Sequence, residues 1–567
     1  MEHRGMRRFG WISWTTLLGL SLGTGCGGNS GADTNSAGAD DGTTSIGSSE
    51  NTEDSAADQG DGDGDPGDGD GDGDPGDGDG GTKFDMSSLP DSDDGPPIDA
   101  CKVVDNMNAV GECEQSAPPD AFEPALQWSF TDEAEPYSYV TPLVANFTDD
   151  DNNGEIDLCD VPDVVLVAAA NPGNPNNTGH IFLLSGDDGS LHFRIEEGVD
   201  SSFTPAIGDI DGDGLVEIVT ASPTGDILAF EHTGELKWSV PADWSGGPGL
   251  RYSNSAALAD VDNDGDVEII TANMFLDHLG NLVEKFPVPS GKWGATTAAD
   301  LDNDEDLEIV IGHAAYHHNG DLLWMTDLEP GYPQVADLDD DGLPEVLLTN
   351  IDGLSLIEHD GQVTYQDQRP TNVGPTGTNW LRPATIHDFD GDGFPEFATS
   401  SASQYTVYEP DASIVWTAPV NDASGIAAGT AFDFLGAGAA QAMYADQDFM
   451  FIFDGDGNVL LQQSRKSGTL SEYPVVADID NDGSAEILVV SNQHLGGGDP
   501  CIQAIKDVED RWIQARRIWN QHSYHVSNVR EDGTIPQFEV PAWEGLNTFR
   551  TNAQIEGGGL CMPPPAG

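Results

Sequence analysis

The chain has 567 residues, which is too long for a single hydrophobic core unless the fold is a repeat array or a propeller. It carries 20 Lys and Arg against 101 Asp and Glu, a formal charge of −81 at pH 7, although 37% of the residues are hydrophobic. Such a surface repels nucleic acid and anionic lipid headgroups, so we expect no nucleic-acid partner and look first to metal cations.

Residues 1–25 predict an export signal. Three arginines within the first eight residues precede an apolar run over 11–22, which is too short for a stable membrane span. Cys26 directly follows Gly23-Thr24-Gly25, an arrangement that resembles a bacterial lipobox, although Gly23 stands where Leu is usual. We therefore expect a lipid on Cys26 that holds the exported chain at the bacterial cell envelope, at the outer membrane or cell surface. The alternative is an ordinary signal peptide with an incidental cysteine.

Residues 26–100 predict a disordered acidic stalk. They contain "DGDGDPGDGDGDGDPGDGDGG" at 61–81 and almost no apolar side chains, so they cannot bury enough surface to offset chain entropy. Repulsion between the carboxylates extends the segment, which suits a spacer. A weak calcium store is the alternative, but flexible Asp-Gly tracts do not preorganise ligands.

A cysteine-containing lead-in follows at 101–124. Five cysteines remain after Cys26, and an exported chain meets oxidising conditions, so we expect disulfides. Proximity in sequence suggests Cys101–Cys113 and Cys501–Cys561, although the sequence alone does not fix the pairing. The odd number leaves one thiol over.

An acidic motif then repeats along the chain, beginning with "DIDGDGLVEIV" at 209–219. Further copies begin at Asp260, Asp300, Asp337, Asp388 and Asp478, and a copy at 433–438 lacks most of the acids. The spacings are 51, 40, 37, 51, 45 and 45 residues, the size of one propeller blade of four short strands.

The residues around each motif predict those strands. A short apolar segment precedes the motif, β-prone residues follow it, and a turn such as "HTGELKW" leads into a last strand. Four residues after the turn glycine lies an aromatic residue, which we expect to pack between blades. The residues concerned are Phe193, Trp238, Trp324, Tyr365 and, after a different turn, Trp416. His313, His317 and His318 resemble a metal cluster, but they lie on one hairpin, and we expect ordinary strand positions.

The fold predicted from these repeats is all-β. It is a β-propeller of about eight four-stranded blades over 125–530, with seven as the alternative, followed by a closing or cap segment over 531–567. The segment "ALQWSF" at 125–130 resembles a last strand such as "ELKWSV", so it could pair with the C-terminal blade and close the ring.

The spacing of the acids within each motif predicts metal ligands. Alternate carboxylates in a curled loop converge on one point, and several hard oxygen ligands in a flexible loop select Ca²⁺. We expect several Ca²⁺ ions, one in each loop. The predicted ligands are Asp209, Asp211, Asp213 and Glu217; Asp260, Asp262, Asp264 and Glu268; Asp300, Asp302, Asp304 and Glu308; Asp337, Asp339, Asp341 and Glu345; Asp388, Asp390, Asp392 and Glu396; and Asp478, Asp480, Asp482 and Glu486.

The first unit carries a different loop, "DDDNNGEIDLCD" at 149–160. Its residues match a twelve-residue EF-hand-type loop position by position, with Asp in place of the usual final Glu. The predicted ligands there are Asp149, Asp151, Asn153, Asp157 and Asp160.

Over about residues 125–510 these repeats resemble the FG-GAP/VCBS family of calcium-binding β-propellers, which includes the head of the integrin α-chain. "FTPAIGDIDGDG" is the VCBS-like form of the motif. The resemblance implies structural ions and a propeller that serves for binding.

Two functions remain open from the sequence. The first is a surface-anchored binding or adhesion module for an unknown extracellular protein or polysaccharide, attached to the membrane only by lipid. The second is a lyase-like enzyme acting on extracellular polysaccharide, for which Arg516, Arg517, His522, Tyr524 and His525 could line a site. The alternative for those five residues is a closing strand and cap. We expect a binding module rather than an enzyme, because no known catalytic motif is visible.

Overall fold

The computed structural model describes residues 100–102, 110–118, 120–171, 178–242, 254–287, 295–370, 382–401, 403–422, 426–493 and 496–566. All of them lie within one structural unit, Ser92–Gly567. The predicted signal sequence, Cys26 and almost all of the predicted stalk lie outside the described residues. Within the described residues, no helix is long and apolar enough to cross a membrane.

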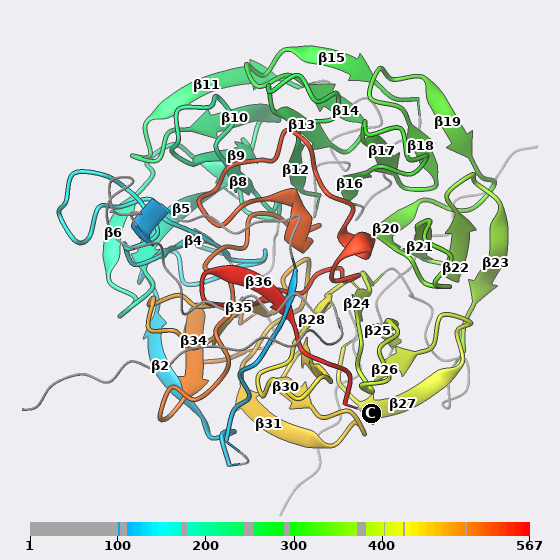
Figure 1. The fold of residues 1–567 in the computed structure, drawn as a ribbon. Helices are drawn as coiled ribbons and strands as arrows, with labels where there is room; N and C mark the ends of the chain where they lie inside the picture. Colours follow the sequence, from blue (N-terminus) through cyan, green and yellow to red (C-terminus); the bar gives the residue numbers. More distant parts are fainter. Residues whose placement is uncertain are drawn as a thin grey trace, which may run out of the picture. The chain divides into compact units, whose positions relative to one another are not determined.

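The described part of the chain is almost entirely β-structure, as predicted. Its antiparallel sheets follow one another around a ring (Figure 1). The helical elements described are three short 3-10 helices, Ala100–Lys102 (η1), Val526–Asn528 (η3) and Ala542–Glu544 (η4).

The first four sheets run in chain order, and we number the blades accordingly. Blade 1 contains β3 (Leu143–Ala145), β4 (Asp163–Ala169), β5 (Thr178–Ser185) and β6 (Leu191–Arg194), with β7 (Val199–Asp200) paired to β5. Blade 2 contains β8 (Ala206–Gly208), β9 (Glu217–Ala221), β10 (Asp226–Phe230) and β11 (Leu236–Pro241). Blade 3 contains β12 (Ala256–Ala259), β13 (Glu268–Thr271), β14 (Met274–Leu276) and β15 (Leu282–Lys285). Blade 4 contains β16 (Thr296–Ala299), β17 (Glu308–Ile311), β18 (Ala314–Tyr316) and β19 (Leu322–Met325).

The remaining sheets continue the same pattern. Blade 5 contains β20 (Gly331–Ala336), β21 (Glu345–Asn350), β22 (Gly353–Glu358) and β23 (Val363–Gln368). Blade 6 contains β24 (Thr385–His387), β25 (Glu396–Ser401), β26 (Gln404–Tyr408) and β27 (Ile414–Pro419). Blade 7 contains β28 (Gly429–Phe432), β29 (Gln441–Ala445), β30 (Phe449–Phe453) and β31 (Val459–Ser464). Blade 8 contains β32 (Val475–Ala477), β33 (Glu486–Val490), β34 (Ile502–Asp507) and β2 (Pro124–Phe130).

The strand from the N-terminal side closes the ring. β2 pairs antiparallel with β34, from Pro124 opposite Asp507 to Phe130 opposite Ile502. This is the pairing predicted for "ALQWSF". It removes the unpaired edge that an open ring of sheets would expose.

Burial within each blade follows from this arrangement. In blade 2, every residue of β8 and β9 is buried, whereas β11 has the mixed pattern of a partly exposed strand. Inner strands lie between neighbouring blades and are apolar on both faces, while the outermost strand lies at the perimeter.

The predicted aromatic residues pack between blades. Each ring lies against the turn glycine of the next blade, so close that a Cβ on the glycine would come within 2.5 to 2.9 Å of the aromatic side chain. The pairs are Phe193 with Gly234, Trp238 with Gly280, Trp324 with Gly361, Trp416 with Gly457 and Trp128 with Gly189. Tyr365 packs in the apolar cluster shared by blades 5 and 6.

The segment after β34 crosses the centre of the ring (Figure 1). Val144 of blade 1 exchanges backbone hydrogen bonds with Trp519, at 3.0 and 2.9 Å, and Ile386 of blade 6 does so with Phe549, at 3.0 and 3.1 Å. The backbone N–H of Ile207 in blade 2 donates to the carbonyl oxygen of Asn520 (2.8 Å). These contacts give hydrogen-bond partners to backbone groups of the inner strands, which line the centre of the ring. The predicted boundary between propeller and cap at 530/531 falls inside this segment.

The predicted disulfides are wrong. The bridges are Cys101–Cys159 and Cys113–Cys561, and Cys501 is a buried free thiol. Proximity in sequence failed for Cys113 and Cys561 because β1 (Gly111–Glu112), near the start of the described residues, pairs with β36 (Gly559–Met562), near their end. β36 in turn pairs with β35 (Gln554–Glu556). Cys113 and Cys561 therefore meet across a sequence separation of 448 residues.

We predict that Gly361→Ala destabilises the protein more than Gly496→Ala does. Both glycines have positive φ, 85° and 93°, so each substitution carries a backbone cost of about 1–2 kcal/mol. Only at Gly361 would the new Cβ meet Trp324, at 2.7 Å, whereas nothing lies within 4 Å at Gly496. The clash should add about 1–3 kcal/mol to the loss of unfolding free energy, measured by denaturant titration. Equal losses in the two variants would contradict blade packing through this contact.

Candidate metal centre

The repeated acidic motif forms the loop between the first and second strands of a blade. In blade 2, Asp209 directly follows β8 and Glu217 is the first residue of β9. The same relation holds in blades 3, 4, 5, 6 and 8. The alternation of acids therefore lies in loops, and the β-prone residues after each glutamate form the second strand.

The first aspartate of each motif folds the loop around itself. Oδ1 of Asp209 accepts hydrogen bonds from the N–H groups of Gly212 (2.7 Å) and Asp213 (3.1 Å), and Oδ2 accepts one from Gly214 (2.9 Å). The N–H five residues after the first aspartate donates in the same way in the other loops, for example from Gly342 to Asp337 (2.9 Å). These bonds curl the backbone so that the later carboxylates converge.

The glutamate of each motif is held at the base of the loop. In blade 2, one oxygen of the buried Glu217 accepts the N–H of Ile210 (3.0 Å). The same bond recurs in the five other acidic loops of the repeat, between 2.7 and 3.1 Å. In blades 5 and 8 the other oxygen of the glutamate is buried and has no hydrogen-bond partner in the described structure. A buried carboxylate oxygen without a partner is costly, and a cation bound in these loops could offset that cost.

Burial also changes the ionisation of these glutamates. Desolvation raises the pKa of Glu217, Glu268, Glu345 and Glu396 to about 8 and that of Glu308 to about 7. It raises the pKa of Glu486 well above the usual range. Without a neighbouring cation, these carboxyl groups would hold protons near neutral pH.

The loop of blade 7, which lacks most of the acids, has an amide in place of the glutamate. Here Gln441 takes the position of the glutamate, and its Oε1 still accepts the N–H of Phe434 (2.9 Å). Its Nε2 donates to the carbonyl oxygen of Ala439 (2.9 Å). Ala439 takes the position of Leu215 in the blade 2 loop, where the backbone carbonyl could serve as one more oxygen ligand. An amide N–H thus fills the space inside this loop, which fits a cation in that space in the acidic loops.

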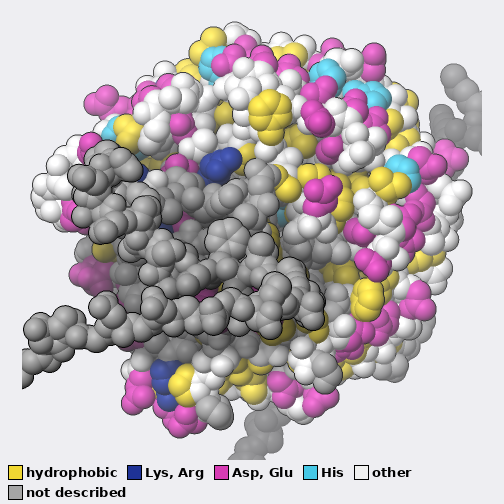
Figure 2. Space-filling view, viewed as in Figure 1, with side chains coloured by type: hydrophobic (Ala, Val, Ile, Leu, Met, Phe, Trp, Pro, Cys, Tyr) yellow, Lys and Arg dark blue, Asp and Glu magenta, His cyan; other side chains and the backbone are white. Residues whose placement is uncertain are grey.

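The carboxylates of several loops lie close enough to hold one metal ion. Their ligand atoms lie within 4.8 Å of one another in the sets Asp209, Asp211 and Asp213; Asp388, Asp390, Asp392 and Glu396; Asp149, Asp151 and Asp160; and Asp302, Glu308 and His317. Figure 2 shows acidic side chains spread around the rim of the viewed face and only a few Lys and Arg side chains. The acidic clusters could therefore bind several cations.

In the loop at 149–160, Asp149, Asp151 and Asp160 lie close enough to hold one metal ion. Asp160 is buried, and its Oδ1 accepts the N–H of Asp150 (2.8 Å). Asn153 and Asp157 are the other two predicted ligands, and Nδ2 of Asn153 donates to Asp151 Oδ2 (3.1 Å). The oxygen of each accepts a nearby backbone N–H, from Glu155 (2.7 Å) and Cys159 (3.0 Å) respectively.

Cationic side chains beside the loops were not predicted. Nζ of Lys237, on β11, lies 2.5 Å from Asp211 Oδ2, 3.2 Å from Glu217 Oε1 and 3.2 Å from Glu231 Oε2. Lys506, on β34, lies 3.7 Å from Asp480 and 3.6 Å from Asp482. The scarcity of lysine in so acidic a chain is the one signal in the sequence that could have drawn attention to these two residues.

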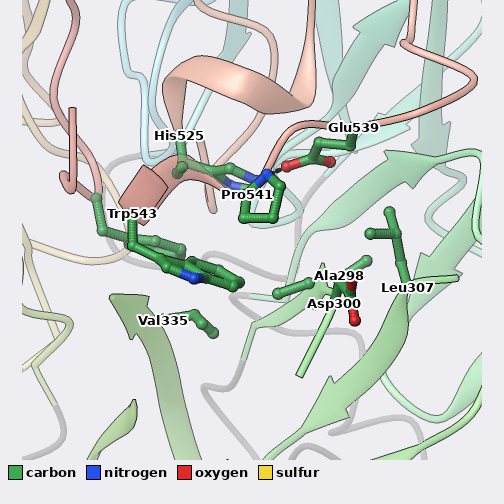
Figure 3. A pocket seen from close by; sticks show the side chains of 11 residues that line it. Ala298, Asp300, Leu307, Val335, His525, Glu539, Pro541 and Trp543 are labelled. Atoms are coloured by element: carbon green, nitrogen blue, oxygen red, sulfur yellow. Dashed lines mark hydrogen bonds and ion pairs between the residues drawn. The ribbon is translucent and has the colours of Figure 1, made fainter. Parts of the chain in front are cut away.

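Two cavities lie where the loops meet the C-terminal segment. The smaller, about 10 Å³, is enclosed between Asp300, Trp543 and the His525–Glu539 pair, whose Nε2 and Oε1 atoms are 2.6 Å apart (Figure 3). It is at the lower limit for one water molecule. The larger, about 250 Å³, lies between the loops of blades 5 to 7 and residues 543–565.

The larger cavity has a mixed lining. Phe394, 53% exposed, and Trp543 supply aromatic surface, while Asp388 and Asp433 supply carboxylates. Gln554 is buried there, and its Oε1 has no hydrogen-bond partner among the described residues. No Lys or Arg is found among the described residues that line this cavity.

Four of the five residues suggested for a catalytic site, Arg516, Arg517, His522 and Tyr524, make contacts at the ring centre. Arg516, His522 and Tyr524 are buried. Nη1 of Arg516 donates to the Tyr524 hydroxyl and to the Val526 carbonyl oxygen, both at 2.9 Å, and burial lowers the pKa of His522 well below its usual range. The Arg517 guanidinium pairs with Glu531 (2.8 Å). These contacts favour the closing and cap role.

Comparison with known proteins supports the same fold. The family model of the FG-GAP-like repeat matches residues 209–271 and 337–399, which confirms the resemblance found in the sequence. The crystal structure of the V. cholerae biofilm matrix protein Bap1 has a TM-score of 0.67 and 22% identity, covering 78% of this chain and 100% of that chain. A Bacillus licheniformis rhamnogalacturonan lyase has a TM-score of 0.48 and 16% identity, covering 80% and 83%. No curated protein sequence matches this chain. The chain is a β-propeller protein with FG-GAP-like repeats.

Proposed function

We propose that the acidic loops bind Ca²⁺ and that the ions hold the blades that carry these loops in their folded shape. The donors are all oxygens: the three aspartates and the glutamate of each motif, with a backbone carbonyl in addition. Hard oxygen ligands in flexible loops suit Ca²⁺ better than Mg²⁺, which keeps more water, or than softer metals. The replacement of glutamate by Gln441 in the loop without acids supports this assignment.

We further propose that the protein is an exported, lipid-anchored binding module. The observation that carries the binding function is the 250 Å³ cavity. Its lining includes Asp388, which is also a proposed calcium ligand in the blade 6 loop. A calcium ion in that loop would fix one wall of the cavity. Binding would therefore depend on calcium without direct contact between ion and ligand.

The lining points to uncharged carbohydrate as the ligand class. Phe394 and Trp543 offer flat apolar surfaces, and Gln554 Oε1 is a buried acceptor that a hydroxyl group could satisfy. Asp388 and Asp433, with the formal charge of −81, would repel a polyanion. A neutral extracellular polysaccharide fits this surface better than an acidic one.

We predict that removal of calcium lowers the melting temperature and that Glu396→Gln removes one ion. The glutamine would reproduce the amide that stands at position 441 in the loop without acids. At a calcium concentration 100 times the dissociation constant, loss of one ion should cost about 2.7 kcal/mol. Elemental analysis and thermal melts, with and without EGTA, measure both effects. Glu197→Gln, which removes an exposed carboxylate outside the loops, should keep the full calcium content. An unchanged melt in EGTA would overturn the calcium assignment.

We predict that the pH dependence of stability reverses when calcium is removed. The folded pKa of Glu345 is about 8 against an ordinary value of 4.5, so without metal the folded state binds the proton more tightly than the unfolded state. Stability should then be highest below about pH 4.5 and fall as pH rises towards 8. With saturating Ca²⁺ it should rise over the same range, because binding releases protons. Denaturant titrations at pH 5 and pH 8 test this, and Glu345→Gln should reduce the slope in EGTA.

We predict that Phe394→Ala abolishes binding of a neutral glycan found on a glycan array and that EGTA does the same. Leu236→Ala is the control, because Leu236 is 48% exposed, similar to Phe394, but lies on the outer strand β11. Equal binding by both variants would place the ligand elsewhere. Release of unsaturated products from acidic polysaccharide would favour the enzymatic alternative.

A further inference from the structure

One hairpin position differs between blade 4 and five of the other blades. The first residue of the turn between the third and fourth strands has an N–H that donates to the carbonyl oxygen four residues later, at 2.8 to 3.0 Å. This position is acidic in five blades and histidine in blade 4. The residues are Glu231, Asp277, His317, Glu358, Glu409 and Asp454, in blades 2 to 7.

His317 faces the acidic loop of its own blade. Its Nδ1 lies 3.0 Å from Glu308 Oε1 and 3.8 Å from Asp302 Oδ2. The Glu308 side chain is fully buried, and its other oxygen accepts the N–H of Leu301 (2.8 Å), so its position is fixed. Asp302 and His317 are each about 30% exposed, which leaves a path for an ion from solvent.

This donor set differs from those of the other loops, because it includes an imidazole nitrogen. Ca²⁺ takes oxygen ligands, whereas imidazole nitrogen suits zinc and other late first-row metals. Two carboxylates and one imidazole, with positions left for water, match the mixed nitrogen and oxygen coordination of Zn²⁺. The loop also departs from the others in sequence, because Glu305 stands at the glycine position with a φ of 78°.

We infer that the blade 4 loop is a zinc-type site formed by Asp302, Glu308 and His317. The inference rests on the proposed function in taking the remaining loops as calcium sites. The first aspartate of this loop, Asp300, keeps its folding role, since Oδ1 accepts the N–H of Asn303 (2.7 Å) and Oδ2 that of Glu305 (3.2 Å). The competing interpretation is that His317 is only a hydrogen-bond partner of Glu308, comparable to Lys237 beside Glu217.

The test uses the full chain in excess Ca²⁺, with Zn²⁺ as the probe. After titration and desalting, elemental analysis should find one tightly held zinc without loss of calcium from the other loops. His317→Gln should weaken zinc binding by at least about tenfold and leave those calcium ions in place. Co²⁺ in place of zinc should give a visible absorption band that the variant lacks.

His318→Gln is the matched control. His318 lies on the same hairpin, has a similar exposure, 29% against 28%, and also faces an aspartate, Asp306, at 3.1 Å. It should retain the zinc. His317→Glu, which restores the acid of the other blades, should exchange zinc for calcium in this loop.

Two results would overturn the inference: no retained zinc in the wild-type protein, or equal retention by His317→Gln. Absence of calcium from all loops would instead refute the proposed function, so the two failures are distinguishable.

Discussion

The structure depends on a buried glutamate that begins the second strand of a blade. One of its oxygens caps a backbone N–H at the start of the loop, as from Ile210 to Glu217 at 3.0 Å, and so ties the first strand to the second. That geometry places the other oxygen in a space with little access to water. The glutamate therefore needs a neutralising partner, and the loop carboxylates around it make a divalent cation the natural one. The same bond recurs in the other five acidic loops of the repeat, where a cation could bind.

Ring closure is the second constraint, and it acts on both ends of the chain. β2 completes blade 8, and the segment after β34 satisfies backbone groups around the channel of the ring. The disulfide Cys113–Cys561 joins the segment after β1 to β36, within the sheet β1-β36-β35. The blade 7 loop lies beneath this covering. A Cβ at Gly438 would lie 2.0 Å from the Pro564 carbonyl oxygen, and Leu435 accepts a hydrogen bond from Ala117 (2.8 Å). That loop is used for packing, which gives a physical reason for the loss of its acids.

The sequence predicts what is periodic and fails on what is long-range. The spacing of Asp209, Asp211, Asp213 and Glu217 was enough to place the loop between two strands, and the likeness of 125–130 to a last strand was enough to predict β2. The C-terminal segment has no repeating sequence pattern that would predict its path, because it contacts a different blade every few residues. For the same reason Cys113 and Cys561 could not be paired from sequence. Lys237 was missed because its contact with Asp211 depends on the register of β11 against β10, which a residue list does not contain.

The loops of the repeat share one backbone design but differ in what balances their charge. Among the described residues, blades 5 and 8 leave a glutamate oxygen without a hydrogen-bond partner, and blade 8 adds Lys506 near the aspartates. In blade 2, Lys237 lies beside the loop carboxylates, and in blade 4 His317 does so. In blade 7, the neutral Gln441 replaces the glutamate. In a chain with five times more acidic than basic residues, such placements are unlike a random surface distribution. A calcium ion in the blade 2 loop must displace an ammonium group, whereas one in the blade 5 loop meets no described cation. Since displacement of a bound charge costs free energy, the blade 2 loop should hold its ion more weakly than the blade 5 loop does.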